Sequence, residues 1–407
     1  MDNSDNFAVV QDRADLQVMM LGGRRCGKTA VLASMFHAIK HGAANEYLTF
    51  SDCTVLRTKG VETQDSLTGK TAELLDLLSR PNTSTFLVDQ GPSKYWWDYR
   101  LKIQTRGTNR AFHINFRDVP GEFFRAGNGH EEEVRAYIKQ CAVFIVVVDT
   151  PYLMESANPE NLLCNDGHNM QVNRLEEIQS FLTNVNKEDN QGKMVVFCPV
   201  KCEKWYNTGR IGDVNKRLQE VYKTTIEDLS GYKKMDISII PVLTAGNIEF
   251  VEQKEAFVLI DNPKNFRLDK LRNSEGLVRC CRQSSKLLRL SDGRPYSVKE
   301  SDIINEDSDA VLTGTRLVRP YSWFKTRFHS DASLNGYRPV NCEQLVLHIT
   351  RFMLAKHDQE RTFFGWLKEI FGGIDPKELK RIINDMQLHG IIKDNKESGV
   401  VHIKTAF

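Results

Sequence analysis

A glycine-rich octapeptide near the start of the chain has the residue types and spacing that hold phosphate groups. Residues 22–29 (GGRRCGKT) fit the pattern G-x-x-x-x-G-K-[ST] at every fixed position. In this pattern, backbone N–H groups surround the phosphates, a lysine reaches the β- and γ-phosphates, and a hydroxyl coordinates Mg²⁺. We therefore predict a catalytic role for Lys28 and a metal-binding role for Thr29. The other predicted nucleotide-binding residues of the loop are Gly22, Gly23, Arg25, Cys26 and Gly27.

The segments on either side of the octapeptide are those that such a loop needs. Residues 16–21 form an apolar run of strand length, and apolar residues recur at helical spacing from Ala30 to Ile39. A strand, a glycine loop and a helix in this order aim loop amides and the positive end of the helix dipole at an anion. The local sequence thus predicts a phosphate loop rather than an ordinary glycine turn.

Three further polar segments each follow a run that we predict to be a strand. The predicted strands are residues 111–117, 194–197 and 237–243. The polar segments behind them are 118–122 (DVPGE), 201–203 (KCE) and 244–247 (TAGN).

The order of these four segments resembles that of TRAFAC-class GTPases and, more narrowly, that of bacterial "double-GTPase" proteins. The resemblance is carried by residues 22–29, 118–122 and 244–250, and it covers about the first 250 residues. It implies an α/β fold: a three-layer P-loop NTPase sheet with helices on both faces, which binds GTP or GDP and Mg²⁺. It also implies a multi-component bacterial conflict or defence system as the setting.

The resemblance assigns roles to residues of the second and fourth segments. Asp118 would hold Mg²⁺ through water, and the N–H of Gly121 would meet the γ-phosphate. Thr244 and Ala245 would contact the guanine carbonyl. A switch threonine that ligates Mg²⁺ should lie before the strand that leads to Asp118, and the candidates are Thr83 and Thr85.

The third segment departs from the family pattern at two positions. GTPases usually carry N-K-x-D there, and the lysine stem and the carboxylate recognise guanine. In this chain Lys201 is in register, Glu203 replaces the aspartate, and Val200 replaces the asparagine. Guanine binding by Lys201 and Glu203 is therefore expected, with ATP as the less favoured nucleotide.

Two residues of the predicted site argue for slow hydrolysis. Glu122 stands where many GTPases carry a water-orienting glutamine; it could orient water or act as a base, but its charge opposes a negative γ-phosphate. Arg24 stands at a loop position where signalling GTPases carry glycine, so it either obstructs an arginine from a partner or leans on the γ-phosphate itself. Both are predicted catalytic residues, and we expect an unassisted rate below about 1 s⁻¹.

Asp149 is the rival of Asp118 for the metal. It ends the buried apolar run 142–148, where an ATPase would hold Mg²⁺. We prefer Asp118 because Asp149 is followed by Thr150 and Pro151, with no second acid beside it.

The chain is expected to have five parts. These are a tail at 1–13, a GTPase-like domain at 14–250 with an insertion at about 44–95, a basic extension at 251–340, a helix at 341–357 that packs on the nucleotide domain, and a helical or winged-helix-like module at 358–407. The module is expected to contain helices at 363–371 and 376–389 and a hairpin of 391–392 with 400–403. The insertion is inferred because about 90 residues separate the phosphate loop from Asp118.

Composition favours a cytoplasmic globular protein. The 407 residues carry a formal net charge of only +2, which gives no global argument for nucleic acid or a membrane. Nine cysteines lack the spacing of zinc sites or of a disulfide framework, so reduced thiols are expected. The polar N-terminus does not resemble a signal peptide, and the longest apolar runs are too short to span a bilayer.

Together these observations predict a GTP-binding, slowly hydrolysing, Mg²⁺-dependent switch. It would control a protein partner through its switch regions and C-terminal module. Two alternatives stay open: an ATP-dependent switch or motor whose C-terminal module contacts DNA, and a subunit that holds nucleotide without hydrolysing it. Nucleic acid is the less favoured partner, because the basic stretch 264–294 contains a single aromatic residue, Phe266, and so lacks aromatic interleaving.

Overall fold

The computed structural model describes most of the chain with side chains and one region as strands alone. The parts with side chains lie within residues 15–23, 26–59, 62–79, 95–124, 129–157, 166–185, 192–246, 337–359 and 374–406. Between residues 248 and 330 only the backbone of the strands is described.

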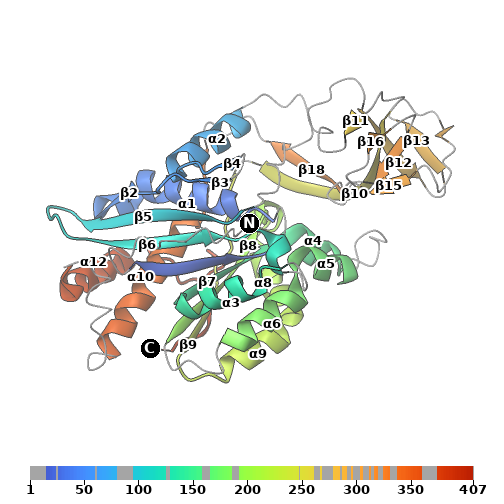
Figure 1. The fold of residues 1–407 in the computed structure, drawn as a ribbon. Coiled ribbons are helices and arrows are strands. Elements are labelled where there is room, and N and C mark those ends of the chain that lie inside the picture. Colours follow the sequence, from blue (N-terminus) through green and yellow to red (C-terminus); the bar gives the residue numbers. More distant parts are fainter. Residues whose placement is uncertain are drawn as a thin grey trace, which may run out of the picture.

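An eight-stranded mixed sheet forms the centre of the molecule, in the order β19-β9-β8-β7-β1-β6-β5-β2 (Figure 1). Its strands are β1 (Leu16–Leu21), β2 (Leu48–Asp52), β5 (Trp97–Thr105), β6 (Ala111–Asp118), β7 (Val143–Asp149), β8 (Lys193–Val200), β9 (Met235–Ile239) and β19 (Val401–Lys404). The five from β9 to β6 run parallel to one another, whereas β5, β2 and β19 are antiparallel to their neighbours. The mixed α/β class predicted from the sequence is therefore confirmed.

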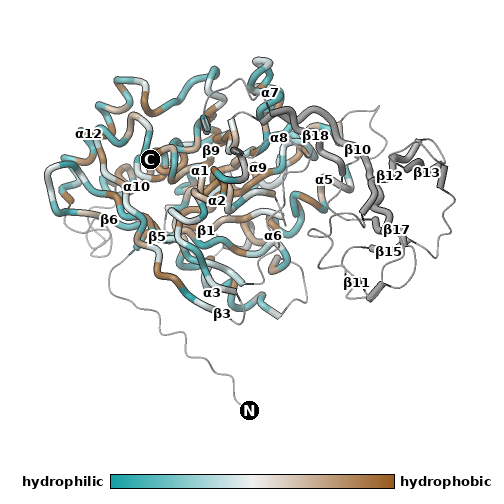
Figure 2. Tube along the Cα trace, turned by 90° about the horizontal axis from the view of Figure 1, so that it is seen from above, coloured by the Kyte–Doolittle hydropathy of each residue, from teal (hydrophilic) through white to brown (hydrophobic). Residues whose placement is uncertain are grey.

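Helices cover both faces of this sheet, because its inner strands are apolar on both sides. Along β1, Val18 and Met20 point into one core, and Met19 and Leu21 point into the other. The first core is closed by α1 (Lys28–His41), α2 (Leu67–Ser79), α10 (Cys342–Gln359) and α12 (Pro376–Leu388). The second is closed by α3 (Glu131–Gln140), α6 (Leu175–Val185), α8 (Ile211–Val221) and α9 (Lys223–Ser230). Figure 2 shows the brown, hydrophobic residues gathered in the strands between these layers.

Short elements connect the strands. They are η1 (Ala43–Glu46), β3 (Thr58–Lys59), β4 (Glu62–Thr63), η2 (Gly121–Phe124), α4 (Thr150–Glu155), α5 (Asp166–Asn173) and α7 (Glu203–Asn207). β7 is followed by α4 and α5, and β8 by α7, so these helices lie at the carboxyl ends of parallel strands. Ligands of open α/β sheets bind at this edge.

Residues 248–330 form a separate set of strands that projects from the main sheet (Figure 1). Their bounds are β10 (Ile248–Ile260), β11 (Phe266–Arg267), β12 (Val278–Ser284), β13 (Leu287–Leu290), β14 (Pro295–Tyr296), β15 (Ile303–Asn305), β16 (Val311–Leu312), β17 (Arg316–Arg319) and β18 (Phe324–Ser330). The longest pairing is the antiparallel ribbon of β10 with β18. The basic side chains expected to matter at 264–294 lie outside the described residues.

The end of the chain differs from the winged-helix expectation. β19 pairs antiparallel with β9, with Val401 opposite Ile239, so it is the edge strand of the main sheet rather than one arm of a hairpin with residues 391–392. Ile392 and Val400 are buried in the core that α12 and α10 share with α1. The physical reason is that β9 offers an unpaired strand edge, which a nearby β-branched segment satisfies. The helix expected at 363–371 lies outside the described residues.

Candidate nucleotide site

The glycine loop lies between the end of β1 and the start of α1. Gly27 caps α1 with φ 104°, a left-handed conformation that favours glycine. A Cβ on Gly22 would lie 2.8 Å from both the sulfur of Cys26 and the carbonyl oxygen of Val147, so the loop folds tightly against β7. Cys26 is fully buried, and burial raises the pKa of its thiol, which makes it a packing residue rather than a nucleophile.

Lys28 folds back over the loop. It is 7% exposed, and its Nζ donates to the carbonyl oxygens of Gly22 and Gly23 at 3.2 and 3.1 Å. A buried ammonium held by neutral carbonyls has no formal counter-charge in these two contacts. It is therefore suited to exchange them for an anion.

Thr29 and Asp118 meet beside the lysine. The Thr29 hydroxyl donates to Oδ2 of Asp118 at 2.6 Å. The contact exists because β6 is the direct neighbour of β1, with Asp118 opposite Met20 at the strand end. Burial raises the pKa of Asp118, while the charge of Lys28 and the Thr29 hydrogen bond act in the opposite direction. Such a buried carboxylate is stabilised by any cation that reaches it.

Asp149 is engaged elsewhere. Its Oδ2 lies 2.5 Å from Nζ of Lys201 in an ion pair, and its Oδ1 accepts from the backbone N–H of Tyr152, which caps α4. The backbone N–H of Asp149 donates to the side chain of Asn173. Its carboxylate thus serves a helix cap and a lysine, which is the physical reason to keep Asp118 as the metal candidate.

Two segments that hold predicted base-recognition residues, the start of α7 and residues 244–246, are joined by hydrogen bonds. Glu203 is 2% exposed, and its carboxylate accepts hydrogen bonds from the backbone N–H groups of Ala245 and Gly246. Burial raises its pKa to about 7. The carbonyl oxygen of Thr244 accepts from the hydroxyl of Ser34 on α1 at 2.9 Å. The structure therefore brings 203 and 244–246 together, with Glu203 already holding the loop.

Lys201 adopts φ 56°, which is uncommon for a residue with a side chain. Its ion pair with Asp149 spans from the end of β8 to the end of β7. Lys201 and Glu203 both follow β8 directly. Both predicted base-reading residues therefore lie at the same edge of the sheet as the phosphate loop.

The segment after Asp118 turns at once. Gly121 is buried and begins η2, and Phe123 stacks on His130 with ring centroids 4.0 Å apart. Phe123 also meets Trp96 edge-on at 5.8 Å. Glu122 lies 3.9 Å from the guanidinium of Arg174. The turn is thus tied to α3 on one side and to the α5–α6 junction on the other.

Four predicted site residues lie outside the described residues. They are Arg24, Arg25, Thr83 and Thr85. Their roles stay predictions.

Sequence reasoning missed the contribution of the α5–α6 junction. Asn173 bonds to the backbone of Asp149, and Arg174 reaches Glu122, so both belong to the surroundings of the loop. It also missed Tyr337, whose hydroxyl lies 2.7 Å from the carbonyl oxygen of Thr244. None of the three lies in a recognisable motif. Asn173 ends α5, Arg174 follows it and Tyr337 precedes α10, so only their positions at helix ends could have indicated a role.

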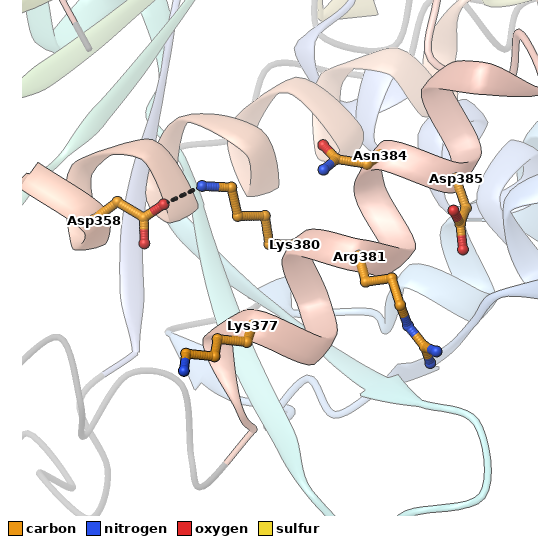
Figure 3. Close-up of a pocket in the computed structure, with 6 residues that line it drawn as sticks. All are labelled: Asp358, Lys377, Lys380, Arg381, Asn384 and Asp385. Atoms are coloured by element: carbon orange, nitrogen blue, oxygen red, sulfur yellow. Dashed lines mark hydrogen bonds and ion pairs between the residues drawn. The ribbon is translucent and has the colours of Figure 1, made fainter.

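A pocket of about 410 Å³ lies between the end of α10 and α12, at the opposite end of the sheet from the carboxyl end of β1 (Figures 1 and 3). It is lined by Asp358, Lys377, Lys380, Arg381, Asn384 and Asp385. Acids and bases alternate there, and Lys380 pairs with Asp358 (Figure 3). Its position separates it from the phosphate loop, and it is a solvated charged surface rather than a candidate active site.

Among the described residues, no helix combines the length and apolar character needed to cross a membrane.

No protein-family model matches the sequence, and no curated protein matches it. Among solved structures, the chain is similar to the crystal structure of the GTPase-like domain of S. cerevisiae Ski7 bound to GTP. The identity is 15% and the TM-score 0.35, and the alignment covers 57% of this chain and 43% of the Ski7 chain. At this TM-score the similarity carries no argument about fold or function.

Proposed function

We propose that the chain binds a guanosine triphosphate with Mg²⁺ and hydrolyses it slowly, acting as a nucleotide switch. The observation that carries the proposal is the 2.6 Å contact between Thr29 and Asp118, beside a buried Lys28 and a glycine loop. Lys28 would exchange the carbonyl oxygens of Gly22 and Gly23 for phosphate oxygens. Loop amides and the N-terminus of α1 would hold the remaining charge.

The residues present fit a magnesium ion. A hydroxyl and a carboxylate are hard oxygen donors of the kind that Mg²⁺ takes together with phosphate oxygens and water. Burial raises the pKa of Asp118 although the charge of Lys28 acts in the opposite direction, so a further cation would stabilise this carboxylate. Thr29 and Asp118 would hold the ion, and when bound it would neutralise charge that develops on the phosphates.

Guanine preference is proposed from Glu203, the first residue of α7. An ionised carboxylate there can accept from the ring N–H and the amino group of guanine, and adenine lacks this pair of donors. The backbone N–H groups of Ala245 and Gly246 already donate to the carboxylate of Glu203. These hydrogen bonds keep it at the carboxyl end of the sheet. Hydrolysis by attack of water on the γ-phosphate releases a diphosphate and inorganic phosphate, and Gly121 and Glu122 lie in the turn suited to sense that loss.

The direct test is equilibrium binding of a fluorescent GTP analogue to the full chain, with and without EDTA, in competition with GTP and ATP. We expect Mg²⁺-dependent binding that GTP competes away at least tenfold better than ATP. Lys28→Ala should abolish it, and Lys223→Ala, an exposed lysine on α9, is the matched control. Absence of binding by the folded chain refutes the proposal.

Base recognition has its own test. Glu203→Gln replaces one acceptor by a donor, so it should weaken GTP binding and strengthen binding of xanthosine triphosphate, whose C2 carbonyl replaces the guanine amino group. If the variant loses all nucleotides equally, Glu203 only holds the loop. If ATP competes as well as GTP with the unmodified chain, the guanine assignment is wrong.

We also propose a protein partner that responds to the nucleotide state. Support comes from the turn that follows Asp118, since Phe123 couples it to His130 and Trp96 and a shift there would reach the surface. The setting in a bacterial defence or conflict system rests on the sequence resemblance alone.

A further inference from the structure

An arginine at the junction between α5 and α6 packs against the phosphate loop. Arg174 is the single residue between these helices, and it adopts φ 52°. A non-glycine residue in this left-handed region is strained, and such residues cluster at functional sites. The strained backbone therefore marks Arg174 as a candidate functional residue.

The stem of Arg174 lies on the loop itself. A Cβ built on Gly23 would lie 1.8 Å from the carbonyl oxygen of Val172 and 3.6 Å from Cγ of Arg174. No side chain would fit at Gly23 without moving the junction. The backbone of the loop and the end of α5 are consequently in direct contact, which fixes the stem of Arg174 beside the loop.

From its stem beside the loop, the guanidinium of Arg174 reaches toward Glu122 in the turn after Asp118. One nitrogen is 3.9 Å from a carboxylate oxygen of Glu122, which is too long for a hydrogen bond, and another donates to Glu177 at 3.2 Å. Among the described residues, Nε of Arg174 is buried and has no hydrogen-bond partner. The side chain is 12% exposed. Glu177 thus holds the guanidinium in place, and the Nε–H group of Arg174 can still donate a hydrogen bond.

We propose that Arg174 is a catalytic arginine supplied by the chain to its own nucleotide, with Glu122 as its resting counter-charge. The inference rests on the proposed function. When a triphosphate enters, the terminal phosphate lies between the loop and the turn, and the guanidinium exchanges Glu122 for phosphate oxygens. As the water oxygen bonds to the γ-phosphorus and the bond to the bridging oxygen breaks, negative charge moves onto the bridging oxygen of the diphosphate. Arg174 stabilises that charge, and the proton of the attacking water leaves to solvent.

The first experiment separates hydrolysis from binding. Arg174→Ala should lower the single-turnover hydrolysis rate at least about 100-fold, while the Kd for GTP changes by less than about threefold. Arg174→Lys should lower it too, because a point charge cannot form the planar fork, and it guards against a misfolded alanine variant. Arg210→Ala is the control, since that arginine also pairs with an acid three residues on but is exposed at the N-cap of α8. A rate within threefold of the unmodified chain in both Arg174 variants overturns the proposal.

The second experiment uses GDP with aluminium fluoride, which mimics the phosphate in transfer. The full chain should bind this complex without any partner protein, and Arg174→Ala should lose it while keeping GDP. If the unmodified chain binds GTP but not GDP with aluminium fluoride, Arg174 does not act in this way and the proposal fails. If the chain binds no nucleotide at all, the proposed function itself fails, which is a different result.

Discussion

The hydroxyl of Thr29 donates to the carboxylate of Asp118 at 2.6 Å, across 89 residues of sequence. The two residues belong to different elements, the first turn of α1 and the end of β6, and adjacent strands bring them together. Asp149 ends the strand on the other side of β1, yet its carboxylate serves Lys201 and a helix cap.

The choice between the two aspartates can be tested with matched variants. Asp118→Asn should weaken GTP binding in Mg²⁺ at least tenfold, because an amide is a poor ligand for a hard cation. In EDTA the variant and the unmodified chain should bind alike. Asp149→Asn removes the same charge two strands away, at the end of β7, and should keep the magnesium dependence. Calorimetric titration with and without Mg²⁺ measures both, and magnesium dependence that is lost only in Asp149→Asn would reverse the assignment.

Close packing at the loop predicts a large effect of one methyl group. Gly23→Ala places a Cβ 1.8 Å from the carbonyl oxygen of Val172, so loop or junction must move. We expect nucleotide binding to be lost and the free energy of unfolding to fall by about 1–3 kcal/mol. Gly212→Ala, in α8 with open space around it, is the control and should be neutral or stabilising by up to about 1 kcal/mol. Unchanged GTP binding by Gly23→Ala would contradict the packing.

Glu122 is expected to restrain hydrolysis. Its charge opposes the γ-phosphate, and it lies 3.9 Å from Arg174. Glu122→Gln keeps the shape, removes the charge and offers an amide that can orient water, so the hydrolysis rate should rise by about tenfold. Glu177→Gln removes the other carboxylate partner of Arg174 and serves as the comparison. A slower Glu122→Gln variant would mean that the carboxylate acts as the base.

Guanine binding should depend on pH through Glu203. Burial raises the pKa of this carboxyl to about 7, and only the ionised form accepts two hydrogen bonds from guanine. The ionised fraction therefore falls about tenfold from pH 8 to pH 6, and GTP affinity should fall with it. ATP carries the same titrating γ-phosphate and is the control; its affinity should change less. Equal pH profiles for GTP and ATP would exclude this role.

Stability on the acid side should depend on His348, which is buried beside Arg351, Asp394 and His402. Burial lowers its pKa to about 3, from about 6.5 for an unfolded histidine. Between pH 6.5 and 3 the unfolded chain binds one proton that the folded chain does not bind. As the pH decreases through this range, the contribution of His348 to the free energy of unfolding therefore falls by about 1.4 kcal/mol per pH unit. Denaturant unfolding at pH 7 and pH 5 should therefore show a smaller loss of free energy of unfolding for His348→Gln than for the unmodified chain.

Glu203 acts in the opposite direction over part of that range. Its raised pKa means that the folded chain binds the proton more readily, so its contribution to the free energy of unfolding grows as pH falls from 7 toward 4.5. The comparison must therefore be made between each variant and the unmodified chain. Identical pH slopes for His348→Gln and the unmodified chain would contradict the assignment for His348.

The sequence by itself determined the position of the glycine loop and the α/β class of the fold, while the phosphate chemistry of the loop stays a prediction. A glycine loop between an apolar strand and a helix is a local pattern, and so are the buried runs that became β7 and β8. These patterns depend on neighbours in the chain, which is why they could be read without coordinates.

Only the tertiary structure decided which distant residues meet. Strand order put Asp118 against Thr29 and gave Asp149 to Lys201, and it placed Arg174 on the loop although no motif marks that residue. It also turned residues 401–404 into an edge strand of the main sheet. Such pairings are settled by the burial and hydrogen bonding of whole strands, a non-local free energy that no short segment carries.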